Sequence, residues 1–168
     1  MSAADPIPAF ADALAARWPA LGIPGPALCA ALTPALRSAA DLRLPAGVVL
    51  DPADTLGVCF VLQGELELRA AGSDGRDAVL RRLRAPGLLL GGDESGARWV
   101  AWTPTHLRLL APGLTEQRLA ERGPGGDALR RLLARALSEG LLEMNLSLAG
   151  AAAPGVRDRG HLGAAEGG

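Results

Sequence analysis

The chain contains no lysine and no tyrosine, so all seventeen of its basic side chains are arginines. Aromatic residues make up only 3% of the sequence, while alanine, glycine, leucine, proline and arginine are abundant, a bias typical of GC-rich bacterial coding. The net charge is −1 and no basic block occurs. Because nucleic-acid-binding proteins usually present a clustered basic face, this composition weighs against DNA binding.

Long hydrophobic runs are absent as well. No apolar stretch reaches the roughly 20 residues that a membrane-spanning helix needs, although 49% of the residues are hydrophobic, which suffices for a core. The first ten residues lack the basic start and apolar stretch of a secretory signal. We therefore expect a cytoplasmic protein whose only two cysteines, Cys29 and Cys59, are buried free thiols.

Residues that carry enzymatic or metal chemistry are equally sparse. His106 and His161 are the only histidines, and neither has a cysteine or a second histidine at metal-binding spacing. Asp93 and Glu94 are adjacent carboxylates without a visible base or nucleophile, which is typical of a solvated loop. No nucleophile elbow, phosphate-binding loop or paired-histidine motif occurs. These absences predict a protein that is not an enzyme and carries neither a metal nor a cofactor.

The N-terminal quarter reads as helices interrupted by proline and glycine. Phe10, Leu14 and Trp18 recur at helical spacing, and the pattern breaks at Pro19. Two further short helices are expected over residues 27–32 and 34–42, with Thr33 as the N-cap of the second. We treat residues 1–26 as a helical extension that precedes the main domain.

From residue 44 to residue 110 the chain reads as short strands separated by turn residues. Glu65 to Arg69 alternates charged and leucine side chains, which predicts a strand with one wet face. Trp99 and Trp102 are placed on opposite faces of a later strand. The expected strands cover residues 57–62, 65–69, 77–83, 88–90, 98–102 and 107–110. Such a series favours a closed roll or barrel.

Helical periodicity returns after the strands. A short helix is expected over residues 115–122, and Asp127 can cap a long helix that runs to about Leu148. Residues from Gly150 onward are mostly alanine, glycine and charged, so we expect a disordered tail over 150–168. The main domain is accordingly assigned to residues 27–149. The fold class is mainly β with flanking helices, a jelly-roll-like β-roll with N-terminal helices and a long C-terminal helix.

An ordered series of motifs lies within this region. The pieces are Leu-Pro-Ala-Gly at 44–47 before a strand, Ala53-Asp54 where a Gly-Asp turn would stand, Asp-Gly at 74–75, Pro-Gly at 86–87 and Ala-Trp-Thr at 101–103. In this order the chain resembles the cyclic-nucleotide-binding domain of the catabolite activator (Crp/Fnr-type) superfamily. The glycines suit turns between strands that reverse within a few residues.

The resemblance implies where a ligand would bind. The family's phosphate-binding cassette carries a Gly-Glu pair that falls here on Gly91 and Gly92, and an arginine position that falls on Ser95. The glutamate that holds the ribose and the arginine that holds the phosphate are thus both missing. Asp93 or Glu94 could replace the ribose contact and Arg98 the phosphate contact; otherwise Arg98 is a surface arginine. A heme-ligand role of Cys59 or His106 is a further possibility of the superfamily, but Cys59 suits a packed strand better.

The long helix corresponds to the family's dimer interface, and the helix-turn-helix that follows it in the transcription factors has no counterpart here. We therefore expect a regulatory or protein-interaction module without cyclic-nucleotide or DNA binding, acting as a homodimer or with a partner protein. The alternative is a sensor of cAMP, cGMP or another small anion that uses an altered cassette. The expected interface residues are spaced three or four apart: Leu129, Leu133, Ala136, Leu137, Gly140 and Met144. Ala136 and Gly140 would let two helices approach closely.

Overall fold

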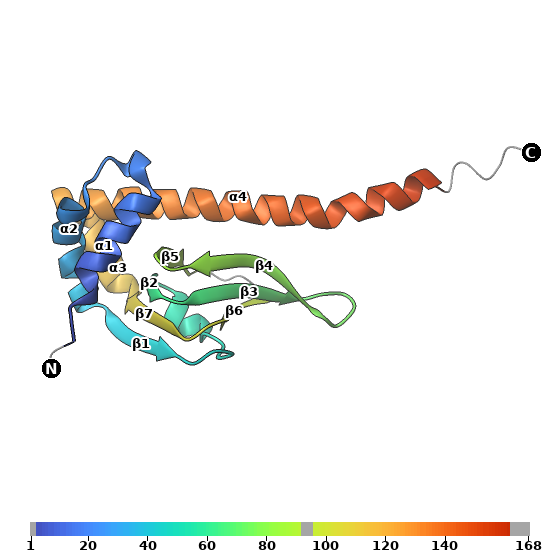
Figure 1. The fold of residues 1–168 in the computed structure, drawn as a ribbon, viewed down its shortest axis with the longest axis horizontal. Coiled ribbons are helices and arrows are strands. Elements are labelled where there is room, and N and C mark those ends of the chain that lie inside the picture. The colour runs from blue at the N-terminus through green and yellow to red at the C-terminus, as the bar shows by residue number, and fades with distance from the viewer. Residues whose placement is uncertain (1–2, 92–95, 162–168) are drawn as a thin grey trace, which may run out of the picture.

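The computed structural model describes residues 3–91 and 96–161 of the chain, and Figure 1 shows their arrangement. Seven strands form a roll, helices cover one end of it, and one long helix lies along it (Figure 1). The helices are α1 (Pro6–Arg17), α2 (Gly25–Ser38), α3 (Pro112–Ala120) and α4 (Pro124–His161), with the short 3-10 helices η1 (Pro19–Leu21) and η2 (Pro52–Thr55). The strands are β1 (Ala40–Leu44), β2 (Val58–Gln63), β3 (Glu65–Ala71), β4 (Asp77–Arg84), β5 (Gly87–Leu90), β6 (Ala97–Ala101) and β7 (Thr105–Leu110).

The first helix belongs to the same packed unit as the roll. Asp5 caps α1 by accepting a hydrogen bond from the backbone N–H of Ile7 at 3.1 Å. Phe10 on this helix meets Phe60 of β2 edge to face, with ring centroids 6.2 Å apart. Ile7 and Leu14 are fully buried in the same cluster. The predicted boundary after residue 26 therefore does not coincide with a break in the hydrophobic core.

The second helix is a single continuous helix, so the expectation of two short helices separated at Thr33 was wrong. Pro34 lies inside α2, and the Thr33 hydroxyl donates to the carbonyl of Cys29 at 2.6 Å instead of capping a new helix. An interior proline costs a backbone hydrogen bond, but α2 buries Leu28 and Leu36 on one face. The helix ends at Ser38, and residues 40–44, where helix was expected to residue 42, pair with β7 as a strand.

The roll consists of two antiparallel sheets with the strand orders β1-β7-β2-β5 and β4-β3-β6. Their inner faces enclose a second hydrophobic cluster that includes Leu50, Cys59, Val61, Leu66, Leu68, Leu89, Trp99 and Leu107. Trp102 lies outside it and is exposed. The prediction of a mainly β roll with flanking helices is confirmed, because the alternating positions of the strands supply both inner faces.

The predicted wet face of β3 needs a correction. Glu67 is only 1% exposed, although the alternation of residues 65–69 places it on the face away from the inner cluster. Its carboxylate pairs with Arg69 at 2.8 Å and with Arg82, which lies opposite it on β4, at 3.3 Å. Two long arginine side chains thus cover this carboxylate, which the sequence alternation could not reveal.

The last helix is longer than expected. Its first half packs on α2, α3, β4 and β5 and buries Leu129, Leu132 and Leu133. The helix continues to His161, so the expected end near Leu148 and the expected disorder of residues 150–161 do not agree with the structure. Residues 162–168 of the expected tail lie outside the described residues. Figure 1 shows α4 running past the roll. Among the described residues, none of the helices combines the length and apolar character that crossing a membrane requires.

Candidate functional site

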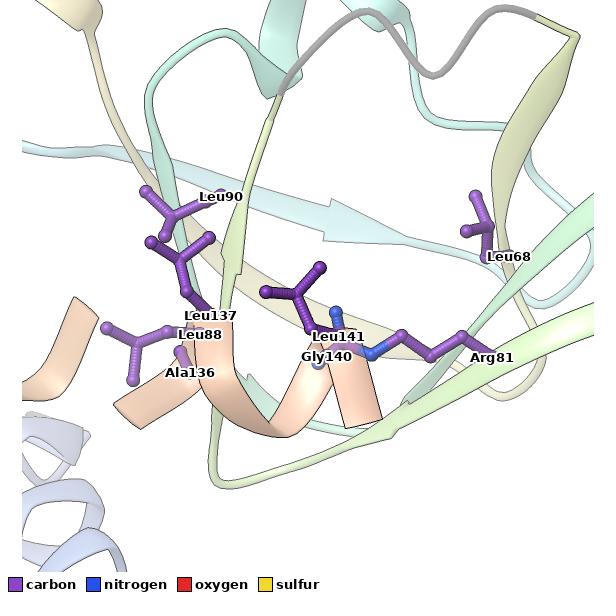
Figure 2. A pocket seen from close by; sticks show the side chains of 8 residues that line it. All are labelled: Leu68, Arg81, Leu88, Leu90, Ala136, Leu137, Gly140 and Leu141. Atoms are coloured by element: carbon purple, nitrogen blue, oxygen red, sulfur yellow. The ribbon is translucent and has the colours of Figure 1, made fainter. Parts of the chain in front are cut away.

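A cavity of about 270 Å³ lies between α4 and the roll. Figure 2 shows the side chains that line it: Leu68, Arg81, Leu88 and Leu90 from the strands, and Ala136, Leu137, Gly140 and Leu141 from α4. Seven of these eight residues are apolar, and Arg81 is the one charged side chain among them. An apolar cleft with one convergent polar group is the usual form of a small-molecule site.

Arg81 faces this cavity because of the way β4 pairs with β3, and a β-bulge follows directly after this pair. Leu68 of β3 lies opposite Arg81 of β4, but the next residue, Arg69, lies opposite Val79, so one residue of β4 is extra. Residues directly opposite each other share a face. Arg81 therefore shares the inner face with Leu68, while Arg82 lies on the outer face beside Glu67.

The guanidinium of Arg81 is held by one carboxylate. Its Nε donates to Oε2 of Glu143 on α4 at 2.8 Å, and its Cζ lies 5.8 Å from the ring centroid of Trp99. The Arg81 side chain is 11% exposed, whereas that of Glu143 is 36% exposed. Because an unpaired charge at such a site would be costly, this ion pair fixes α4 against β4 at this point.

Gly140 allows the Arg81 guanidinium to lie this close to α4. A Cβ built on Gly140 would lie 2.8 Å from Nη1 and 3.0 Å from Cζ of Arg81. Figure 2 shows the Arg81 side chain extending to the helix at this glycine. Within the chain, Gly140 gives room to an arginine of its own roll, and its place in a close helix–helix crossing stays a prediction.

Of the five predicted ligand-binding residues, the structure describes Gly91 and Arg98. Arg98 lies on the outer face of β6, opposite Arg69, and its guanidinium pairs with Asp77 at 2.5 Å. Arg98 therefore does not face this cavity, since the sheet lies between them, and its contact with an anion at the predicted cassette stays a prediction. A Cβ on Gly91 would overlap the Thr55 carbonyl oxygen at 0.9 Å, so this glycine serves close packing. Gly92, Asp93 and Glu94 lie outside the described residues.

The structure buries some of the predicted interface residues of α4 and leaves another exposed. Leu129, Leu133 and Ala136 are buried in the chain's own core against α2 and β5, so these three residues cannot form an external interface. Leu137 remains exposed at the edge of the cavity. Met144 lies in α4, but its side chain is not among those described.

Sequence reasoning missed Arg81, although a signal was present. Arg81 and Arg82 are adjacent in an expected strand, and adjacent strand residues point to opposite faces. One of the two therefore had to face the interior of the roll. The pairing of β4 with β3 decides which one, and this pairing cannot be seen in the sequence of β4 alone.

His106 and Cys59 have structural surroundings. His106 lies within β7, not at the expected turn before it, and its Nε2 is 2.5 Å from Oδ1 of Asp41 on β1. This hydrogen bond, with a smaller contribution from the nearby Arg108 and Arg43 charges, lowers the pKa of Asp41 below 3.8 despite some desolvation. Burial raises the pKa of the Cys59 thiol to about 12, so its thiolate form is suppressed. Cys29 is half-buried, so the expectation of two buried thiols holds only for Cys59.

Within the part of the chain that the structure describes, no three His, Cys, Asp or Glu side chains are grouped so that they could hold a metal ion.

A β-roll of two antiparallel sheets, followed by a long helix with a cavity beneath it, defines the cyclic-nucleotide-binding-like fold. Solved structures with this architecture include the heme domain of CooA from Carboxydothermus hydrogenoformans, 16% identical, covering 77% of this chain and 96% of that chain with a TM-score of 0.57. The heme domain of CooA from Rhodospirillum rubrum is 20% identical, with 68% of this chain and 83% of that chain covered and a TM-score of 0.56.

A transcriptional regulator of the Crp/Fnr family from Eubacterium rectale is 16% identical, with a TM-score of 0.50 and 67% of this chain covered. The match spans only 56% of that regulator. No family model and no curated protein matches the chain. The resemblance to the Crp/Fnr-type superfamily is thus confirmed as a shared fold.

Proposed function

We propose that this chain is a non-catalytic regulatory module that acts through protein contacts on α4 and binds no cyclic nucleotide. The observation that carries the proposal is a set of exposed leucines in the middle of the helix. Leu137, Leu141, Leu142 and Leu146 are 52% to 66% exposed. Large apolar side chains gathered on one element mark interaction sites more often than scattered ones do.

A second copy of the chain is the proposed partner. A helix of 38 residues that passes the roll gains little stability by itself, because helices in proteins rely on packing of an apolar face. Leu142 and Leu146 are one turn apart on a side of α4 that does not line the cavity. The corresponding helix forms the dimer interface in the superfamily that the chain resembles, which favours a homodimer.

Sedimentation of a double variant tests this assembly. Leu142→Glu with Leu146→Glu should convert a wild-type dimer to monomer without loss of the circular dichroism signal. Leu56→Glu is the matched control, since Leu56 is 59% exposed and lies outside α4, and it should leave the dimer intact. A monomeric wild type would contradict self-association, and a variant that stays dimeric would contradict the role of this face.

A second candidate function is the sensing of a small ligand in the cavity beneath α4. It is favoured by one observation, a nearly buried arginine among leucines at a site of about 270 Å³. Heme, which the two CooA domains are named for, does not fit these residues. Among the lining residues that the structure describes, none is a histidine, cysteine or methionine that could serve as an axial ligand. His106 is bound to Asp41, and Cys59 is buried inside the roll.

A further inference from the structure

We propose that the cavity beneath α4 binds a small apolar monocarboxylate, whose carboxylate replaces Glu143 on Arg81 and so detaches α4 from β4. This inference rests on the sensing function proposed above and names its ligand class and its effect. It starts from a contact that is already present. The Glu143 carboxylate occupies, at 2.8 Å from Nε of Arg81, the position that a ligand carboxylate would take.

The charge of the site selects a single negative charge. Arg81 is the one ionised residue among the eight lining residues, so one carboxylate neutralises it completely. A phosphate or a dicarboxylate would carry a second charge into surroundings that are otherwise leucine, alanine and glycine, which is costly. Arginine also matches the flat geometry of a carboxylate with its planar fork of donors.

The walls select an apolar body of limited size. Leu68, Leu88, Leu90 and Leu137 present hydrocarbon to the cavity, and Figure 2 shows Leu137 beside Leu90 at one end of it. A cavity of about 150 Å³ holds benzene, so about 270 Å³ accommodates a medium-length alkyl chain or a substituted aromatic ring. A hydroxylated or charged body would lose hydrogen bonds to water without replacement.

The two partners of the ion pair differ in what they lose when it opens. Glu143 is 36% exposed and can return to water, whereas Arg81 is 11% exposed and must keep a counter-charge. A ligand carboxylate therefore exchanges with Glu143 and leaves Arg81 paired. The exchange removes the ion pair that holds α4 to β4.

A second ion pair still holds α4 one helical turn before Glu143. Glu139 of α4 accepts a hydrogen bond from Nη2 of Arg17 on α1 at 3.1 Å, and this pair does not line the cavity. The ligand thus frees α4 beyond Glu139 while the helix stays attached before it. Leu142 and Leu146 lie in the freed part, so binding would change the surface proposed for assembly.

Isothermal titration calorimetry of the full chain with octanoate tests the proposal, with 1-octanol and inorganic phosphate as matched probes. Wild type should bind octanoate at least tenfold more tightly than octanol and should not bind phosphate. Arg81→Gln should abolish this preference. Glu143→Gln should bind octanoate several-fold more tightly, because the competing carboxylate is gone.

Glu139→Gln is the matched control on the same helix, and it should leave octanoate affinity unchanged. Equal affinity for octanol and octanoate, preferential phosphate binding, or no gain in Glu143→Gln would each overturn the proposal. If Arg81→Gln fails to fold, the test still rests on two measurements. These are the affinities of wild type for octanoate, 1-octanol and phosphate, and the affinity of Glu143→Gln for octanoate. Absence of octanoate binding with an intact dimer would refute this inference and leave the assembly proposal standing.

Discussion

The role of a single residue in this chain depends on the face of the sheet on which its side chain lies. Arg81 and Arg82 are neighbours in sequence, yet Arg81 faces an apolar cavity and Arg82 pairs with the buried Glu67 on the opposite face. The two nearby tryptophans divide in the same way: Trp99 is buried in the roll, and Trp102 is exposed beneath the guanidinium of Arg69. The same residue type thus serves two environments within a few positions.

Asp41 provides a prediction about pH at this scale. Its pKa is lowered in the folded protein, chiefly by the hydrogen bond from His106. The stabilisation from this carboxylate is therefore fully present above its ordinary pKa of 3.8 and is lost as the pH falls through the lower folded value. Asp41→Asn should cost about 1 kcal/mol or less at pH 7, because half of the Asp41 side chain is in solvent.

Urea unfolding of wild type and Asp41→Asn at pH 7, 5 and 3 measures this contribution. The difference in unfolding free energy should be the same at pH 7 and 5 and should shrink at pH 3. A difference that stays constant down to pH 3 would contradict the lowered pKa of Asp41.

At the scale of elements, α4 changes its surroundings along its length. Its beginning is buried by α2, α3 and β5, exposed leucines follow from Leu137 to Leu146, and the end of the helix reaches past the roll. The ion pairs Arg17–Glu139 and Arg81–Glu143 lie where the first region passes into the second. One helix thus completes the hydrophobic core and also offers a surface to a partner.

Two leucine truncations on α4 should differ sharply in effect. Leu132 is fully buried, so Leu132→Ala should lower the free energy of unfolding by about 2–5 kcal/mol through lost contacts and a cavity. Leu142 is 61% exposed, so Leu142→Ala should change it by no more than about 0.5 kcal/mol in the monomer. Urea unfolding at low protein concentration compares the two. A large loss in Leu142→Ala under these conditions would show that this part of α4 packs on its own roll.

At the scale of the whole molecule, the chain shares its fold with the solved structures of Crp/Fnr-type regulators, and the described cavity is lined mostly by apolar side chains. Its lining carries one arginine and no carboxylate that could hold a ribose. Arg98, the residue that could have replaced the cassette arginine, lies on the far side of the sheet. The shared fold does not by itself establish a cyclic-nucleotide site, so function has to be argued from the residues.

Thermal melting with millimolar cAMP or cGMP should show no rise in Tm. A ligand at one hundred times its Kd would stabilise the fold by roughly 2.7 kcal/mol, which corresponds to a shift of a few degrees for a domain of this size. Sodium chloride at matched ionic strength is the control for unspecific salt effects. A clear rise with either nucleotide would contradict the non-binding prediction and support the sensor alternative with an altered cassette.

The sequence by itself determined the order of elements, because alternation, helical spacing and turn residues are local signals. It placed six of the seven strands and the long helix, and its ordered motifs indicated the β-roll. It failed where distant segments decide the outcome. Pro34 is accommodated inside α2 because that helix is held by the core, and residues 40–44 are a strand because β7 is available as a partner.

Tertiary structure alone decided the candidate site. The pairing of Arg81 with Leu68 places Arg81 on the inner face. Packing against α2 and β5 removes Leu129, Leu133 and Ala136 from the predicted interface, since burial depends on which surfaces meet.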